Sequence, residues 1–253
     1  MTFRIGRIAS MAAVALIVGA AGAAAGLEWR ASAGEAQTLA SQTRTINHLQ
    51  DEVSSLERFL SSHPEWSAVA DRVEPSVVTV ETDDDLGSGW VAHADAGGSD
   101  IVTNFHGVES AYAVGVRSVE VFHFDQELKG TIVRVDRTDD LAVVHVSERL
   151  PALTAVTARP KAGTWVMAVG APLGLSQSVS VGVIAAYRSI EGSDYVQFTA
   201  QISPGNSGGP VTDQQGRVVG IATGKLVYPG SEGLGFAIPV QTACASLVAC
   251  EQA

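Results

Sequence analysis

Cysteine is nearly absent from this sequence: among its 253 residues, Cys244 and Cys250 are the only two. In a helical C-terminal tail, a spacing of six residues puts two side chains roughly 120° apart around the axis and about 9 Å apart along it. A disulfide cannot span that separation. We therefore expect both cysteines to be small, partly apolar residues of the interior rather than a bridge, and the sequence leaves their redox state open.

Metal-ligand clusters are also missing. His93 and His123 have no cysteine, histidine or carboxylate at the spacing of a metal site, and His145 alternates with apolar neighbours in a strand-like stretch. His48 and His63 lie before the part of the chain that reads as globular. We expect no metal and no cofactor.

Positive charge is scarce as well. Sixteen basic residues stand against 27 acidic ones, which gives a net charge of −11, and only 17% of the residues are charged. This balance argues against nucleic acids and anionic membrane surfaces as partners. An apolar content of 46% with 26 glycines fits a β-rich globular protein with a substantial core.

The most informative stretch that is present runs from Pro204 to Pro210, with the sequence Pro-Gly-Asn-Ser-Gly-Gly-Pro. Glycine supplies backbone conformations that other residues avoid, and proline stiffens the flanks. Such a loop presents the hydroxyl of Ser207 together with unobstructed N–H groups, which is what covalent acyl transfer requires. The plain alternative is a glycine-rich turn without chemistry.

Chain order separates the two catalytic folds that could use this loop. The pattern G-x-S-x-G also occurs in α/β-hydrolases, but those enzymes need a histidine after the serine, and none follows Ser207. The order His106, Asp140, Ser207 is that of chymotrypsin-like enzymes. Asp139 is the rival for the acid; Asp140 is preferred because it directly precedes an apolar strand.

Seven blocks in this order resemble the HtrA (Deg) branch of the trypsin-like serine proteases, from Val69 to about Val240. The blocks are Val73-Glu74-Pro75-Ser76-Val77-Val78, Gly87-Ser88-Gly89-Trp90-Val91, Thr103-Asn104-Phe105-His106, Asp140-Leu141-Ala142-Val143, Val169-Gly170-Ala171-Pro172-Leu173-Gly174, the serine loop, and Gly235-Phe236-Ala237-Ile238-Pro239.

The resemblance implies a serine endopeptidase in which His106 is the base, Asp140 orients it and Ser207 is the nucleophile. The N–H groups of Gly205 and Ser207 would form the oxyanion hole. By the same resemblance the primary specificity pocket is lined by residues that include no carboxylate, so small or medium aliphatic substrate residues are expected rather than Arg or Lys. These lining residues are Thr199, Ala200, Gln201, Ala222, Thr223 and Gly224.

Two features depart from the family. Phe105 and Gly107 flank the histidine where Asn and an aliphatic residue are usual, and Gly107 could loosen the backbone that holds His106. Relatives often continue into a peptide-binding PDZ domain, whereas we expect none here.

The N-terminal stretch from Ile8 to Leu27 is uncharged and follows Arg4 and Arg7. Twenty residues suffice to cross a bilayer, and the arginines predict a cytoplasmic N-terminus. We expect a retained transmembrane helix in a bacterial envelope, with the remainder outside the cytoplasm. The alternative is a signal peptide cleaved near Ala23-Ala24-Ala25 or Ala31-Ser32-Ala33, which would give a periplasmic or secreted protein.

Apolar residues then recur with heptad spacing up to Pro64. This pattern predicts a short coiled coil, with a spacer helix as the alternative. Members of the resembled family work as trimers, so a homo-oligomer such as a trimer is expected, acting on protein or peptide substrates. The heptad positions are Leu39, Ile46, Leu49, Val53, Leu56 and Leu60.

From Val69 onward, short strands separated by Gly, Pro and Asp turns indicate an all-β fold. The resemblance implies two six-stranded antiparallel barrels of the chymotrypsin type. We expect an anchor or signal segment at 1–33, a heptad helix and linker at 34–64, and the protease domain at 65–243. Its barrels would cover about 69–150 and 160–240, followed by a tail at 244–253 and a closing helix from Gln241 to Ala253. The rival to an enzyme is a catalytically silent protease fold that serves as a membrane-tethered scaffold.

Overall fold

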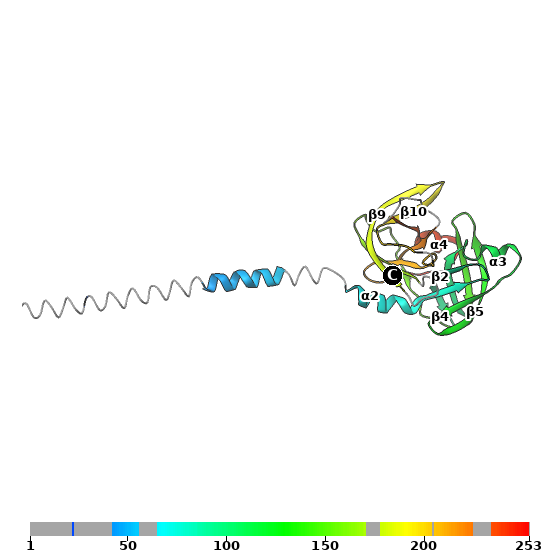
Figure 1. The fold of residues 1–253 in the computed structure, drawn as a ribbon, viewed down its shortest axis with the longest axis horizontal. Helices are drawn as coiled ribbons and strands as arrows, with labels where there is room; N and C mark the ends of the chain where they lie inside the picture. The colour runs from blue at the N-terminus through cyan, green and yellow to red at the C-terminus, as the bar shows by residue number, and fades with distance from the viewer. Residues whose placement is uncertain are drawn as a thin grey trace, which may run out of the picture. The chain divides into compact units, whose positions relative to one another are not determined.

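The computed structural model describes residues 22, 42–55, 65–170, 178–203, 205–224 and 234–252. The chain divides into two compact units, residues 1–63 and 64–253. All the strands of the described residues lie in the second unit (Figure 1).

In the first unit, residues 42–55 are helical, as the heptad pattern predicts; they form the blue helix of Figure 1. Ile46, Leu49 and Val53 lie on this helix, whereas the heptad positions Leu39, Leu56 and Leu60 fall outside the described residues. Over the part of the chain that is described, no helix combines the length and apolar character needed to span a membrane. The predicted anchor from Ile8 to Leu27 lies outside that part except for Gly22.

The second unit begins with helix α2 (Trp66–Val73) and a 3-10 turn, η1 (Glu74–Ser76). Six antiparallel strands then close into a barrel in the order β1-β2-β3-β6-β5-β4. A short helix, α3 (Glu109–Ala113), follows β3. The strands are β1 (Val77–Glu81), β2 (Leu86–Asp95), β3 (Gly98–Asn104), β4 (Ser118–His123), β5 (Gln126–Asp136) and β6 (Leu141–Val146).

The second barrel is built by β11-β8-β9-β10-β13-β12, and a further pairing of β11 with β12 closes it. Strands β7 and β14 extend the same sheet beyond β12. The predicted all-β fold with two six-stranded barrels is therefore confirmed. The strands are β7 (Thr154–Ala155), β8 (Trp165–Gly170), β9 (Ser178–Ile190), β10 (Ser193–Phe198), β11 (Pro210–Thr212), β12 (Val218–Thr223), β13 (Gly235–Pro239) and β14 (Glu251–Gln252).

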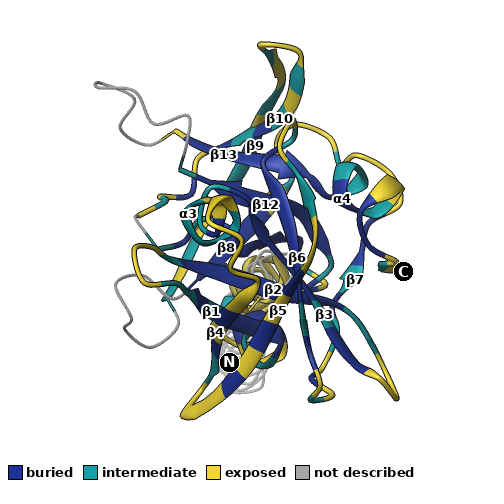
Figure 2. Ribbon diagram, turned by 90° about the vertical axis from the view of Figure 1, so that its right-hand side faces the viewer, coloured by how far each residue is buried: buried dark blue, intermediate teal, exposed yellow. Residues whose placement is uncertain are grey.

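Four strands of the first barrel, β1, β2, β3 and β6, are buried on both faces, which explains why apolar residues stand next to one another in them. In β6, Ala142 and Val144 pack inside the first barrel, while Leu141 and Val143 join the core that the second barrel contributes to. Trp90 and Val91 of β2 divide in the same way. Strand β5 instead alternates buried and exposed residues, visible as yellow and blue along its ribbon in Figure 2. The interface between the barrels is thus part of the main core.

The C-terminus differs from the prediction. Helix α4 (Val240–Ser246) ends early. The N–H of Leu247 makes a regular helical bond to the carbonyl of Ala243, but the N–H of Val248 donates to the same carbonyl, one residue too far back for an α-helix. The side chains of Leu247 and Val248 are buried at this point. The chain then turns back, and β14 pairs in parallel with β7. The expected closing helix to Ala253 is therefore too long.

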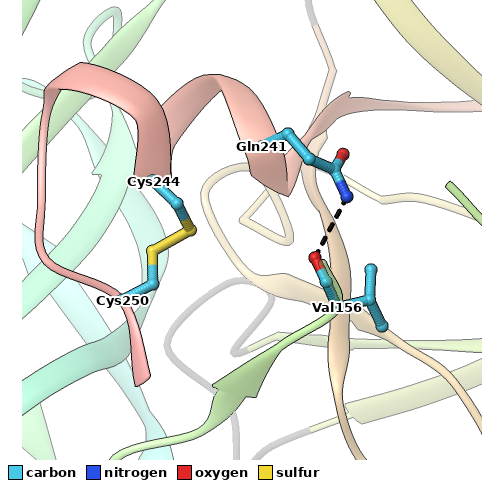
Figure 3. The surroundings of a disulfide bond; sticks show 4 residues. All are labelled: Val156, Gln241, Cys244 and Cys250. Atoms are coloured by element: carbon cyan, nitrogen blue, oxygen red, sulfur yellow. Dashed lines mark hydrogen bonds between the residues drawn. A yellow bond between two sulfur atoms is a disulfide. The ribbon is translucent and has the colours of Figure 1, made fainter. Parts of the chain in front are cut away.

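The turn brings Cys244 and Cys250 into a disulfide with a Cα–Cα distance of 5.4 Å, so the expectation of unbridged cysteines was wrong. It assumed a helix that continued through both residues. Figure 3 shows the bridge joining the end of α4 to the returning segment, while the Gln241 side chain donates to the carbonyl of Val156 at 3.1 Å. The C-terminal segment is thus held by a hydrogen bond in the first turn of α4 and by the bridge after it.

Removing the bridge should destabilise the second unit. With a sequence separation of six between the cysteines, loop-closure entropy gives a cost of about 2 kcal/mol for Cys244→Ala with Cys250→Ala. Urea denaturation under non-reducing conditions would measure it, with Ala245→Ser on the exposed side of α4 as the matched control. Equal stability of the double variant and the control would show that the bridge does not constrain this tail.

Candidate active site

His106 and Asp140 meet because their strands are neighbours in the first barrel. Asn104, the last residue of β3, pairs with Leu141, the first residue of β6. The carboxylate of Asp140 lies 2.8 Å from His106 Nδ1 through Oδ2, and its Oδ1 accepts the backbone N–H of His106 at 2.9 Å. One carboxylate therefore holds both the ring and the backbone of the histidine.

The carbonyl of Asp140 is held as well. It accepts the backbone N–H of Phe105 at 3.0 Å and the side-chain amide of Asn104 at 3.1 Å. Asp140 has a left-handed backbone with φ of 55°, which aspartate tolerates better than most residues. Its side chain is only 5% exposed, whereas that of His106 is 35% exposed. The pair thus combines a buried acid with a reachable imidazole ring.

The neighbouring carboxylates have other roles. Asp136 Oδ1 accepts the N–H groups of Thr138 and Asp139 at 2.9 and 3.1 Å and so shapes the turn before β6. Asp139 belongs to that turn. Of the two rivals in the sequence, the geometry favours Asp140 as the partner of His106.

The serine loop is fixed to the first barrel through Ser88 on β2. The N–H of Ser88 donates to the carbonyl of Ser207 at 2.8 Å, and its hydroxyl donates to the carbonyl of Gly205 at 2.6 Å. Sequence reasoning quoted Ser88 as part of a motif without foreseeing this role. Its only signal was a serine between two glycines at the start of an apolar strand.

Gly208 allows this contact. Its backbone has a φ of 87°, and a side chain there would meet the carbonyl of Ser88 at 2.1 Å and the hydroxyl of Thr103 at 2.4 Å. The loop therefore lies directly against β3 shortly before His106. Gly208 also donates to the carbonyl of Ala222 at 2.8 Å, which ties the loop to β12 of the second barrel.

The hydroxyl of Ser207 accepts the N–H of Gly224 at 2.9 Å. A hydroxyl has one donor proton and two acceptor lone pairs, so this bond fixes Oγ and leaves its proton for another acceptor. The His106 ring is thus hydrogen-bonded to Asp140, and Ser207 Oγ is hydrogen-bonded to Gly224. A contact with β3 through Gly208 connects the two halves of the site.

The residues expected to line the specificity pocket come from two segments of the second barrel. Thr199, Ala200 and Gln201 follow β10, and Thr199 Oγ1 accepts the N–H of Val183 at 2.9 Å. Ala200 is buried, whereas Gln201 is exposed. The other segment is the end of β12 with the next residue: Ala222 and Thr223 are buried, and Gly224 is the residue that contacts Ser207.

Tyr195 on β10, whose ring lies 6.5 Å from that of Phe236, feels the charge of the site, and sequence reasoning missed it. Burial raises the pKa of its hydroxyl, and the negative charges of Asp140 and Asp139 raise it further. The phenol therefore remains neutral at physiological pH. No sequence signal marked it, because the tyrosine belongs to an ordinary strand pattern.

Phe105, one of the departures from the family pattern, is a packing residue. It is 4% exposed, and its ring lies 5.9 Å from that of Tyr112 in an edge-on arrangement. The guanidinium of Arg137 lies 5.4 Å from the Phe105 ring and 5.8 Å from the Tyr112 ring. This cluster joins α3 to the turn that precedes Asp140, so it supports the backbone on both sides of the pair.

Three other histidines of the second unit each have a partner. His145 Nδ1 lies 2.8 Å from Asp100, His123 contacts the carbonyl of Pro75 at 2.9 Å, and His93 lies 3.4 Å from Glu251. Within the described ranges, no group of three or more His, Cys, Asp or Glu is arranged to hold a metal ion.

The glycines around the site should respond oppositely to alanine. At Gly107 a methyl group would make only an ordinary contact, 3.7 Å from the carbonyl of Asn104, so Gly107→Ala should stabilise the fold by about 0.4–1 kcal/mol. Gly208→Ala should destabilise it by more than about 1 kcal/mol, because both its φ and its surroundings exclude a side chain. Paired urea denaturation curves would measure both; a greater loss at Gly107 than at Gly208 would contradict the packing described here.

Comparisons with known proteins agree with this geometry. The family model described as "Trypsin-like peptidase domain" matches residues 87–221. The putative serine protease HhoB of Synechocystis is 36% identical over 62% of this chain and 38% of its own length. A probable periplasmic serine endoprotease of the DegP-like type from Chlamydia trachomatis is 37% identical over 60% of this chain and 31% of its own. The chain thus spans about a third of the length of these curated relatives.

Solved structures show the same fold. The serine endoprotease from Yersinia pestis is 30% identical with a TM-score of 0.62, covering 72% of this chain and 65% of the other. Deg5 is 29% identical with a TM-score of 0.61, covering 71% and 90%, respectively. With more than half of its residues matched by the family model, the chain belongs to the trypsin-like peptidase family, on its HtrA/Deg-like branch.

Proposed function

We propose that this protein is a serine endopeptidase that hydrolyses peptide bonds in unfolded or exposed segments of proteins. The observation that carries the proposal is the His106–Asp140 pair, held at 2.8 Å beside a loop that presents Ser207 and is fastened to the same barrel. Family membership and the relatives' printed names support the same chemistry.

The roles follow from the hydrogen bonds. With Nδ1–H donating to Asp140, the lone pair of His106 Nε2 can accept the proton of Ser207 as Oγ attacks the peptide carbonyl. The imidazolium then protonates the leaving amine, and an acyl-enzyme remains on Ser207. A water molecule, deprotonated by His106, attacks this ester, and the proton returns to Ser207 as the acid leaves. Asp140 stays ionised and stabilises the imidazolium throughout.

The oxyanion hole would be formed by the backbone N–H groups of Gly205 and Ser207. The support is the rigidity of the loop, since the carbonyls of both residues are bound to Ser88. Donors that are fixed before the reaction need no reorganisation when charge develops, and each is typically worth about 10²–10³-fold in rate.

Specificity for small or medium aliphatic residues is part of the proposal. The lining segments, Thr199 to Gln201 and Ala222 to Gly224, contain no carboxylate to bind Arg or Lys. Gly182 and Gly235 lie against the backbone of Ala200, where a side chain on either would come within 2.8 Å of it. The wall of the proposed specificity pocket is therefore built from backbone and small side chains.

Labelling with a fluorophosphonate probe tests the nucleophile and its base together. Wild-type protein should label, Ser207→Ala should not, and His106→Gln should label about 10²–10⁴-fold more slowly. The wild-type rate should rise with pH, because only the neutral imidazole accepts a proton. Mass spectrometry of the labelled peptide and a pH series would measure these effects.

Two results would contradict the assignment. A folded protein that never labels, with or without peptide substrate, would favour a silent scaffold with a protease fold. A pH-independent labelling rate would remove His106 from the role of base.

We also propose an envelope location. Curated relatives are described as periplasmic, and the uncharged stretch from Ile8 to Leu27 after two arginines is suited to a retained anchor. A cleaved signal segment is the alternative for the same stretch.

Expression in a bacterium followed by fractionation should place the full-length chain in the membrane fraction with its original N-terminus. Salt washing should leave it there, since an anchor depends on apolar burial rather than charge. Peptide mapping that finds a soluble mature chain beginning at Gly26 or Gly34 would replace the anchor with a signal peptide.

A further inference from the structure

The 42–55 helix carries a narrow apolar stripe on an otherwise polar surface. Ile46, Leu49 and Val53 are its large apolar residues, and their exposed fractions are 55%, 52% and 52%. They follow one another at intervals of three and four residues, so they lie on one face. The rest of the helix is polar: Gln42, Thr43, Arg44, Thr45, Asn47, His48, Gln50, Asp51, Glu52, Ser54 and Ser55.

This stripe has the shape of a packing site. A shallow hollow lies on the helix surface, lined by Ile46, Leu49, Gln50, Val53 and Ser54. The first four of these stand at i, i+3, i+4 and i+7, which is the diamond of residues that receives one knob side chain in a coiled coil. The helix therefore presents a hole at the level of Leu49.

We propose that residues 42–55 are the described part of a parallel, in-register coiled coil between copies of this chain. In such a pair the hole at Leu49 receives Leu49 of the partner subunit, and the reciprocal contact is made by symmetry. Ile46 and Val53 form the neighbouring layers, each against the same residue of the second copy.

The flanks of the stripe favour a second copy over a partner of a different kind. Thr43, Thr45 and Gln50, which border the apolar face, carry no charge, and Glu52 is the one charged residue there within 42–55. Like copies can therefore approach with little repulsion, and nothing in this stretch calls for a partner of opposite charge. The charged or titratable residues Arg44, His48 and Asp51 lie on the outer face.

Self-association would also stabilise this helix. Most helical stability in proteins comes from burying an apolar face rather than from helix propensity. Half-exposed Ile46, Leu49 and Val53 supply such a face.

Cysteine cross-linking tests the register. Both native cysteines are paired with each other, so an introduced cysteine supplies the reactive thiol. Under mild oxidation, full-length Leu49→Cys should form covalent dimers at least ten times faster than Asp51→Cys, its control on the outer face. In a mixture of Ile46→Cys and Val53→Cys, each should link to itself. Equal rates at positions 49 and 51 would overturn the proposal, and links between positions 46 and 53 would overturn the parallel register.

Mass measurement tests whether the stripe causes the association. The wild type should have a whole-number multiple of the chain mass by light scattering, and that multiple gives the number of helices. Ile46→Asp with Val53→Asp should lower the mass to that of one chain, because the apolar stripe would then bury unpaired charges between the helices. The control Asn47→Asp with His48→Asp adds two acids on the outer face and should keep the oligomer.

A monomeric wild type would show that the helix is a spacer or packs on its own protease unit. A double aspartate variant that keeps the wild-type mass would show the same. Neither readout uses peptidase activity, so the outcome is independent of the proposed function.

Discussion

The site depends on how Asp140 is held. Its carboxylate binds the ring and backbone N–H of His106, and its carbonyl binds Phe105 and Asn104. A residue bound from both ends cannot rotate without losing hydrogen bonds in a buried place, where unmade bonds are costly. The left-handed backbone at Asp140 persists because these four contacts determine it. The buried ring of Phe105 packs beside this turn, between Tyr112 and Arg137.

The two barrels hold the candidate active site together, and neither barrel forms it alone. Strands β1, β2, β3 and β6 place alternate residues in the first barrel and in the core shared with the second. Beside that core, Ser88 and Gly208 join the barrels a second time, because the serine loop contacts β2 and β3 there. Alignment of the proposed nucleophile with its base is therefore a property of the interface and not of either barrel.

Much of this could be predicted from the sequence. The run Leu141 to Val146 is apolar, bounded and short, and it forms β6 over those residues. The resemblance carried by the ordered blocks also implied two barrels, and it favoured Asp140 over Asp139 as the acid that partners His106. Ser88 was not foreseen, because a hydrogen bond to a loop more than a hundred residues away has no local pattern. The bridge between Cys244 and Cys250 was missed because a helix end set by buried Leu247 and Val248 depends on tertiary packing.

The bridge bears on when the fold is completed. Cys250 directly precedes β14, which pairs with β7, about a hundred residues earlier along the chain. Disulfides persist in oxidising surroundings and are rare where thiols are kept reduced. In an exported chain, the last strand could dock during folding but would become fastened only after the thiols met an oxidant. The Cys244–Cys250 bond would then form only in chains that had left the reducing compartment.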